Sequence, residues 1–383
     1  MIRLQTIYKP TLVVEIIIAV LALVRCELSI VQSSLLGGLL SNILLVLGMS
    51  FLAGGFKYSS QSFKLLPASL NTSLLFLSVL SLMIPLSFHT ILGDKFPENP
   101  MIEKTFILQM SRGTSIILIF IYLCYMTFTF YTHQEEFLDT IDNDESNYNH
   151  GQPKTYASDF NLNEHSSANF DLEAGLSGRR LTRSKTAPIM TPQSTDSDST
   201  KCEDKAQNRL GDRKIEEPKL NIFISISILI ITTILLYFTC EALVDSIQGL
   251  ANSTSASKEW ISLIILPIVG NAAEHATAVI AAAKGKQELA LSVALGSTVQ
   301  IAIFVIPLVV LIAWMISKPL TLLFEPMETI TLFLSVILAR FAIDDGRSHW
   351  LSGCVLCGSY LIIALVFWYF PKSDTFELIK CVT

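Results

Sequence analysis

Charged residues are scarce in this chain. Asp, Glu, Lys and Arg make up 16% of its 383 residues, whereas 51% are hydrophobic. Soluble domains carry roughly a quarter of their residues as charged side chains, so the composition argues against an ordinary soluble protein. The formal net charge is -6, and no basic groove suggests a nucleic-acid partner.

Cysteine is also sparse. Seven cysteines are scattered along the chain, most of them inside apolar blocks, which argues against a disulfide framework. Cys354 and Cys357 form a single CxxC pair, and a structural zinc site needs four ligands. The sequence also lacks a nucleophile–base pair, a metal-hydrolase motif and the layout of a signal peptide. We therefore expect neither enzyme activity nor a bound cofactor.

Long apolar blocks are what the sequence does contain. A membrane-spanning helix needs about 20 apolar residues, and nine stretches qualify as candidate spans. They cover residues 11–24, 33–55, 69–92, 106–131, 220–248, 259–283, 288–316, 320–342 and 349–370. The sequence therefore predicts an all-α polytopic membrane protein. Lys and Arg divide about evenly between the two sides, so the orientation is not predicted.

Residues 134–219 differ in kind from the rest. They are rich in Ser, Thr, Asn and Asp and poor in large apolar side chains, which predicts a disordered loop. An acidic segment at 135–145 is either a solvated linker or a cation-collecting or regulatory patch. Basic residues flank hydroxyl groups in the 177–200 region, which suggests kinase sites. The chain thus divides into a first transmembrane repeat (1–133), a loop (134–219) and a second repeat (220–383).

An internal repeat relates the two membrane parts. Residues 11–50 align without gaps to 270–309, and eight of the forty positions are identical, including Glu15 with Glu274. Four spans separate the first helix from its repeat mate, so the mates have opposite orientations in the membrane. Inverted repeats place the substrate site near the bilayer midplane, where the halves meet. Two carboxyl groups would then face each other there.

These carboxyl groups suit a divalent cation. Ionisable groups inside a membrane are costly and usually mark an ion or proton pathway. Calcium takes about six to eight oxygen ligands. The predicted metal ligands, with Gly270 marking a bent helix that frees backbone carbonyls, are Glu15, Glu274, Asn271, Gln300, Ser41, Ser297 and Gly270. Protons would compete with the metal for the same carboxylate oxygens, which is a mechanism for exchange.

Three further residues are assigned to the proton or ion pathway. His275 either tunes protonation or satisfies a backbone carbonyl. Glu241 and Asp245 lie four residues apart on one helix face and could line a water-filled approach or lie at the interface. Arg112 and Glu328 lie near span ends and could simply extend toward the membrane surface. The glycines at 37–38, 48 and 54–55 are expected to allow close helix packing.

Several motifs together resemble the calcium/proton exchanger (CAX) family of the calcium/cation antiporters. They are Gly270-Asn271-Ala272-Ala273-Glu274-His275, Ala294 to Ile301, Val31 to Gly48, Ser111 to Thr114, Leu243 to Ser246 and Asp345 to Ser348. The resemblance covers the chain except residues 146–218. It implies two inverted five-helix halves joined by an acidic helix. Members lie in fungal or plant vacuolar membranes, import calcium in exchange for protons, and in some cases carry manganese.

The sequence departs from the family pattern in its first repeat. Thr11 and Leu12 stand where the family has Gly-Asn, Gly38 stands where a small hydroxyl residue is common, and only fourteen residues precede Glu15. We therefore expect an N-terminally incomplete first repeat.

The resulting hypothesis is a secondary antiporter that exchanges Ca²⁺ for H⁺ across an organelle membrane, and the family resemblance implies the vacuolar membrane. The alternative is a transport-inactive, truncated paralogue that modulates a full-length exchanger. Sodium coupling is a third reading. Ca²⁺, H⁺ and membrane lipid are the expected partners, and Mn²⁺ transport, a homo-oligomer or a paralogue partner is left open.

Overall fold

The computed structural model describes residues 10–95, 100–133, 222–253 and 257–369. The chain divides into two compact units, and the larger one comprises Met1–His150 and Ile228–Thr383. Apart from the first residues of one helix, everything described below belongs to this larger unit. The predicted disordered loop at 134–219, its acidic segment and its kinase sites lie outside the described residues, as do most residues before Glu15.

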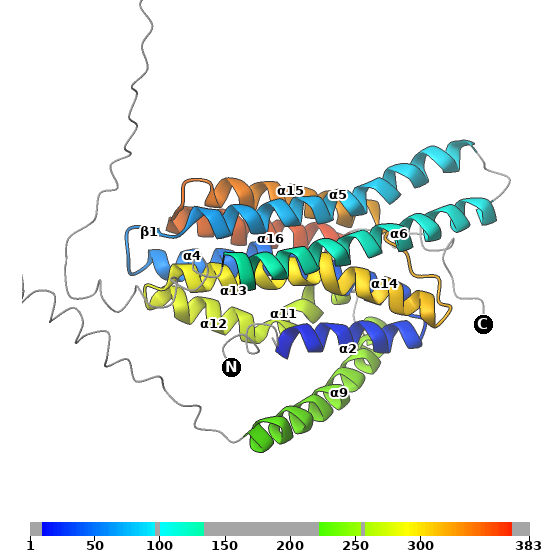
Figure 1. The fold of residues 1–383 in the computed structure, drawn as a ribbon, viewed down its shortest axis with the longest axis horizontal. Coiled ribbons are helices and arrows are strands. Elements are labelled where there is room, and N and C mark those ends of the chain that lie inside the picture. The colour runs from blue at the N-terminus through cyan, green and yellow to red at the C-terminus, as the bar shows by residue number, and fades with distance from the viewer. Residues whose placement is uncertain (1–9, 96–99, 134–221, 254–256, 370–383) are drawn as a thin grey trace, which may run out of the picture. The chain divides into compact units, whose positions relative to one another are not determined.

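The larger unit is built almost entirely from helices (Figure 1). The first half holds α2 (Pro10–Val24), α3 (Leu28–Leu40), η1 (Ser41–Val46), α4 (Leu47–Gly55), α5 (Leu65–Lys95), α6 (Pro100–Thr127) and η2 (Phe128–Thr132). The second half holds α9 (Ile222–Ser253), α10 (Lys258–Trp260), η4 (Ile261–Ile265), α11 (Leu266–Gly270), α12 (Ala272–Ala283), α13 (Gln287–Gln300), η5 (Ile301–Val305), α14 (Ile306–Met315), α15 (Pro326–Ile343) and α16 (Trp350–Tyr369). The η segments are π-helical. The all-α prediction is confirmed.

Each predicted span corresponds to a helix or a helix pair. Among the described residues, six helices are long and apolar enough to cross a membrane, and the bent pair Lys258–Gly270 and Ala272–Ala283 makes a seventh if it is one span. The shorter α2 and the 32-residue α9 account for the other two. Four predicted boundaries differ from the structure by five or six residues. The second span begins at Leu28 and not at 33, the fourth begins at Pro100 and not at 106, the fifth ends at Ser253 and not at 248, and the eighth begins at Pro326 and not at 320.

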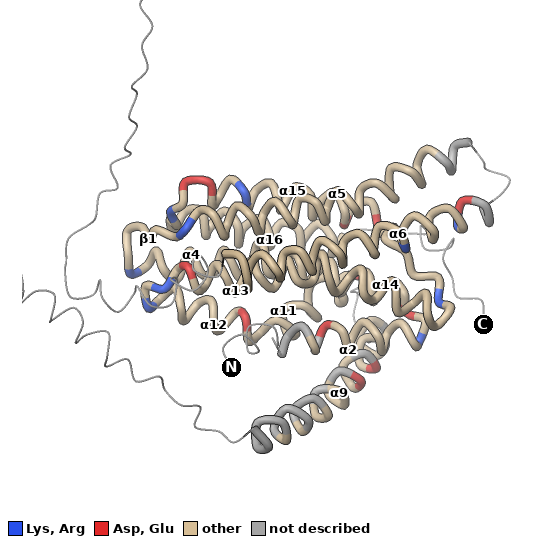
Figure 2. Tube along the Cα trace, viewed as in Figure 1, with Lys and Arg blue, Asp and Glu red and all other residues tan. Residues whose placement is uncertain are grey.

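The two helices that correspond in the internal repeat form the centre of the bundle. The apolar window of Leu28–Gly55 is 83% buried and that of Gln287–Met315 is 67% buried, compared with 17% for Glu103–Thr132 and 22% for Trp350–Tyr369. The central helices are apolar all round because protein surrounds them, whereas the outer ones expose apolar side chains toward lipid. Charged residues gather at the two ends of the helices (Figure 2).

One end of the bundle is tied together by a short antiparallel ribbon. Strand β1 (Gln61–Ser62) pairs with β2 (Arg347–Ser348), which joins the α4–α5 connection to the α15–α16 connection. The Gln61 side-chain amide also donates to the carbonyl of Ala282, near the end of α12, at 3.2 Å. We call this the ribbon end. The opposite end, where α2 ends and α3 and α10 begin, is called the Arg25 end.

The α14–α15 connection explains the wrong boundary at 320. Residues 318–325 are not helical, yet Leu320–Phe324 are each at most 3% exposed. Non-helical backbone is tolerated at such depth only when its polar groups find partners inside the protein. The Gln32 side-chain amide of α3 donates to the carbonyls of Thr321 at 3.1 Å and Leu323 at 2.8 Å. A hydropathy pattern cannot distinguish this buried segment from the start of a helix.

Replacing Gln32 is expected to destabilise the fold. The substitution Gln32→Leu leaves the carbonyls of Thr321 and Leu323 buried without this donor, and we expect the free energy of unfolding to fall by about 2 kcal/mol. A melting experiment on purified protein in detergent measures it as a lower Tm. Gln109→Leu, on the exposed face of α6, is the matched control and should melt like the wild type. Equal Tm values for both variants would contradict the expectation.

Candidate functional site

A small cavity in the centre of the bundle is lined by polar side chains from both halves. The non-atom space between its lining residues is about 190 Å³, including space open to solvent, and it is narrow throughout. Its lining residues come from α2, η1, the α11–α12 break, α12, α13 and η5, and they are Glu15, Asn42, Asn271, Glu274, Ser297, Gln300 and Ile301. Five of the seven metal ligands predicted from the sequence therefore meet here: Glu15, Asn271, Glu274, Ser297 and Gln300.

The helix that carries Asn271 and Glu274 is broken at the cavity. The α10–α11 part and α12 are bent by 53° relative to each other, and Asn271 between them has φ -96° and ψ 17°. Pro267 and Gly270 precede the break, as the prediction of a bent helix required, and that prediction is confirmed. Glu274 lies in the first turn of α12, where the helix dipole favours a negative charge.

His275 stabilises this break. Its Nδ1 lies 2.6 Å from the carbonyl oxygen of Asn271, which also accepts the backbone N–H of His275 at 3.0 Å. The carbonyl freed by the break is thereby satisfied inside the protein. Of the two roles considered for His275, this geometry matches the structural one, and the imidazole is not among the groups that line the cavity.

The position of Glu15 depends on the absence of a side chain at Gly38 of α3. A Cβ atom at Gly38 would lie 2.9 Å from Oε1 of Glu15, closer than real Cβ contacts allow. The neighbouring Gly37 performs the packing role expected of it, because its Cβ would lie 2.6 Å from Cγ of Pro267 and would overlap the Leu263 carbonyl. The departure from the family pattern at Gly38 thus makes room for the carboxyl group.

Asn42 is the lining residue that sequence reasoning missed. It is fully buried, and its Nδ2 donates to the Ser297 hydroxyl at 3.1 Å, which links the two central helices. Ser41 was predicted as a ligand, but it does not line the cavity, and its hydroxyl lies 3.5 Å from Nε2 of His275. The π-helical segment η1 begins at Ser41 and changes which side chain faces the cavity. An Asn inside an apolar run was the available signal.

The chemistry of the cavity is that of oxygen ligands. Glu15 and Glu274 interact electrostatically, although they belong to different halves. Glu15 Oε2, Asn42 Oδ1 and Gln300 Oε1 are buried and accept no hydrogen bond. In the part of the chain that the structure describes, no group of three His, Cys, Asp or Glu residues could hold a metal. A cation here would rely on two carboxylates with amide and hydroxyl oxygens, which suits a hard ion such as Ca²⁺.

A second cavity extends from this centre toward one end of the bundle. It holds about 310 Å³, including space open to solvent, and shares Glu15 and Asn271 with the first. Its lining residues are Glu15, Ile18, Ser34, Leu35, Gly38, Leu266, Pro267, Gly270 and Asn271. They reach from the level of the carboxyl groups toward the Arg25 end, for example from Glu15 to Ile18 on α2 and from Gly38 to Ser34 on α3. Gly270, also a predicted ligand, lies in this cavity.

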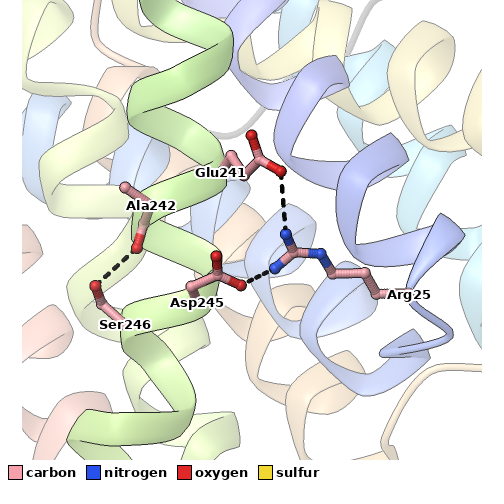
Figure 3. A network of polar contacts seen from close by, with 5 residues as sticks. All are labelled: Arg25, Glu241, Ala242, Asp245 and Ser246. Atoms are coloured by element: carbon pink, nitrogen blue, oxygen red, sulfur yellow. Dashed lines mark hydrogen bonds and ion pairs between the residues drawn. The ribbon is translucent and has the colours of Figure 1, made fainter.

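The acidic pair Glu241 and Asp245, which could line the approach or lie at the interface, binds a basic residue. Figure 3 shows the guanidinium group of Arg25, just after α2, between Glu241 and Asp245 of α9. Arg25 donates to the Asp245 carboxylate and, at 3.4 Å, to that of Glu241. These ion pairs are partly exposed and contribute little stability individually. Two carboxylates thus lie at the Arg25 end, and in this structure both are paired with Arg25.

Cysteine plays no part in this site. Of the cysteines that the structure describes, Cys124, Cys354 and Cys357 are free, so the CxxC pair is reduced. Cys26 is disulfide-bonded, and a single bonded cysteine among the described residues does not amount to the disulfide framework that the sequence argued against.

Comparison with known proteins gives one family. A family model described as "Sodium/calcium exchanger protein" matches residues 11–131 and 224–369, which include both halves of the bundle and every residue that lines the two cavities. The match covers well over half of the chain.

Curated relatives and solved structures agree with it. The chain is 40% identical to a vacuolar calcium ion transporter of Cryptococcus neoformans over 96% of its own length and 63% of the relative's, so it spans less than two thirds of that protein. It is 34% identical to a vacuolar calcium ion transporter of Schizosaccharomyces pombe, over 94% of this chain and 69% of the relative. The crystal structure of the Ca²⁺/H⁺ antiporter protein YfkE matches with a TM-score of 0.61 and 25% identity, over 94% of this chain and 83% of YfkE.

The contact between Gly38 and Glu15 generates a prediction. The substitution Gly38→Ala forces the Glu15 carboxyl group away, and we expect the dissociation constant for calcium to rise about tenfold, a loss of about 1.4 kcal/mol. Equilibrium binding of radioactive calcium to the purified chain measures it. Gly358→Ala in α16, where a Cβ would meet nothing within 4 Å, is the matched control and should leave binding unchanged. Unaltered binding in Gly38→Ala would show that Glu15 is not held in place by this contact.

Proposed function

We propose that this chain, which belongs to the sodium/calcium exchanger protein family, exchanges Ca²⁺ for H⁺ across a membrane, with Glu15 and Glu274 as the carboxylates that both ions share. The single observation that carries the proposal is that these two carboxyl groups, one from each repeat, line one buried cavity. The vacuolar calcium transporters among the relatives and the Ca²⁺/H⁺ antiporter YfkE support both ions and a vacuolar membrane location.

The proposed cycle uses the lining residues in distinct roles. Glu15 and Glu274 neutralise the charge of the calcium ion. Asn42, Gln300 and Ser297 supply neutral oxygens, and two of these residues have buried oxygens that accept no hydrogen bond in the structure. When calcium leaves, two carboxylates would remain together in an apolar environment, and this is costly unless they take up protons. Metal and protons therefore exclude each other at one site.

Access in the proposed cycle comes from the Arg25 end. The second cavity joins the central one at Glu15 and Asn271 and reaches toward that end. At the ribbon end, Gln61 and Lys57 donate to the carbonyls of Ala282 and Ala283 and hold the end of α12. The site would therefore be open on one side and closed on the other, as alternating access requires.

The other readings gain less support. A transport-inactive paralogue is not favoured, because the relatives are named as transporters. Transport of Mn²⁺, regulation by kinases and an oligomeric state stay predictions. Glu241 and Asp245 stay candidates for the ion pathway only in a state in which Arg25 has released them.

Transport itself is the first test. Radioactive calcium uptake into proton-loaded vesicles containing this chain should collapse when the proton gradient is dissipated, and Glu274→Gln and Glu15→Gln should both reduce it to background. Each variant removes one of the two charges that balance calcium. Replacing the proton gradient with a sodium gradient tests whether calcium transport is coupled to sodium.

The matched control is Asp344→Asn, which removes a carboxylate from an exposed i,i+4 ion pair with Arg340 at the ribbon end. Its uptake should equal that of the wild type. Full uptake by Glu274→Gln would refute the site assignment, whereas uptake driven by sodium alone would refute proton coupling.

Competition between calcium and protons has its own signature. Because protons occupy the same oxygens, lowering the pH should weaken calcium binding, by about tenfold per pH unit for each proton displaced. Calorimetric titrations in two buffers of different ionisation enthalpy measure the protons released. Glu15→Gln should reduce the number released, and Asp344→Asn should not. A calcium affinity that is independent of pH would exclude the shared-site mechanism.

A further inference from the structure

A third buried carboxyl group lies away from the central cavity, in the first turn of α15. Glu328 is only 2% exposed, so the expectation that it extends to the membrane surface is wrong. The hydroxyl group of Ser33 on α3 donates to its Oε1 at 2.7 Å. Its other oxygen, Oε2, is buried and has no hydrogen-bond partner. One side of this carboxyl group is thus satisfied and the other is not.

Two further carboxyl groups face Glu328 from different parts of the chain. Glu259 belongs to α10, Glu325 directly precedes α15, and both interact electrostatically with Glu328. Oε2 of Glu259 is likewise buried without a hydrogen-bond partner. The two unsatisfied oxygens belong to segments that both contact α3, namely α10 and α15, and the two carboxyl groups are close enough to interact electrostatically.

This arrangement is unfavourable without a cation. Buried carboxylates of like charge repel each other, and each buried oxygen that lacks a partner adds a desolvation cost. Oε2 of Glu328 and Oε2 of Glu259 do not hydrogen-bond to each other, and a cation between two carboxylates satisfies both. Among the described residues near Ser33, the carboxylate oxygens without a partner are Oε2 of Glu328 and Oε2 of Glu259. This agrees with the absence of any three-residue metal cluster among the described residues. Such a site binds more weakly than a cage with more carboxylates.

We propose that Glu328 and Glu259 bind a second divalent cation beside Ser33, at the Arg25 end of the bundle. Ser33 is the neighbour of Ser34, which lines the cavity that leads to Glu15. The second site therefore lies at the same level of α3 as that cavity, on a different face of the helix. The inference concerns binding alone and does not depend on transport.

Counting bound ions tests the second site. Equilibrium binding of radioactive calcium to the purified full chain should give two ions for the wild type and one each for Glu274→Gln and Glu328→Gln. The double variant Glu274→Gln/Glu328→Gln should bind none. Asp344→Asn in the Glu274→Gln background is the matched control and should retain one ion. If Glu274→Gln already binds none, or if adding Glu328→Gln leaves its ion in place, the proposal is wrong.

Terbium(III) luminescence locates the ion. Trp260 is the direct neighbour of Glu259, so it should sensitise terbium bound at this site when tryptophan is excited. Trp368 packs against Trp260 with ring centroids 4.7 Å apart, so it can sensitise the same ion. In the Glu274→Gln background, calcium should displace the signal, and the double variant Trp260→Phe/Trp368→Phe should abolish it while calcium binding persists. A signal that survives this double variant would place the ion elsewhere and overturn the assignment.

Folding is controlled with a second ligand variant. Glu259 is less buried than Glu328, and Glu259→Gln in the Glu274→Gln background should fold and lose the terbium signal. If this variant elutes as a folded protein and keeps the full signal, the proposal fails. Because none of these measurements uses a gradient, failure of the second site and failure of calcium/proton exchange remain distinguishable.

Discussion

Two consecutive glycines in α3 determine how closely the two halves of the bundle meet. Gly37 lets α3 contact the backbone around Leu263, and Gly38 leaves the space that the Glu15 carboxyl group occupies. A side chain at either position would separate the halves or displace the carboxyl group. Small residues allow helices in membranes to pack at short distance. The central cavity and the interaction between Glu15 and Glu274 depend on this close contact between the halves.

Departures from regular helix then give the cavity its polar lining. The π-helical segments η1 and η5 begin at Ser41 and Ile301, nearly equivalent positions in the two repeats, and the break at Asn271 interrupts a third helix at the same depth. Backbone groups that are freed where the helix is irregular need hydrogen-bond partners inside the protein, because no water is available to them. His275 provides such a partner for the carbonyl of Asn271. Irregular backbone therefore occurs where both halves of the bundle surround it. π-Bulges are frequently found at functional sites.

The sequence was sufficient for the fold and for most of the site, for identifiable reasons. Long apolar blocks predict spans because lipid imposes one length and composition, and the repeat pairs Glu15 with Glu274 because duplication preserves register. The prediction of Ser41 as a ligand missed its neighbour Asn42, because the π-helical segment that begins at Ser41 changes the direction of the side chains that follow. Glu328 was misjudged because proximity to a span end says nothing about what packs against it.

The two ends of the bundle differ in a way that bears on opening and closing. At the ribbon end, the last carbonyls of α12 accept hydrogen bonds from Gln61 and Lys57, so moving α12 away means breaking contacts of which one is buried. At the Arg25 end, exposed ion pairs join α2 to α9, and water can replace them at little cost. The second cavity extends toward the end with the weaker contacts. In the proposed cycle, closing this side would bring α2 and α11, which both line that cavity, closer together.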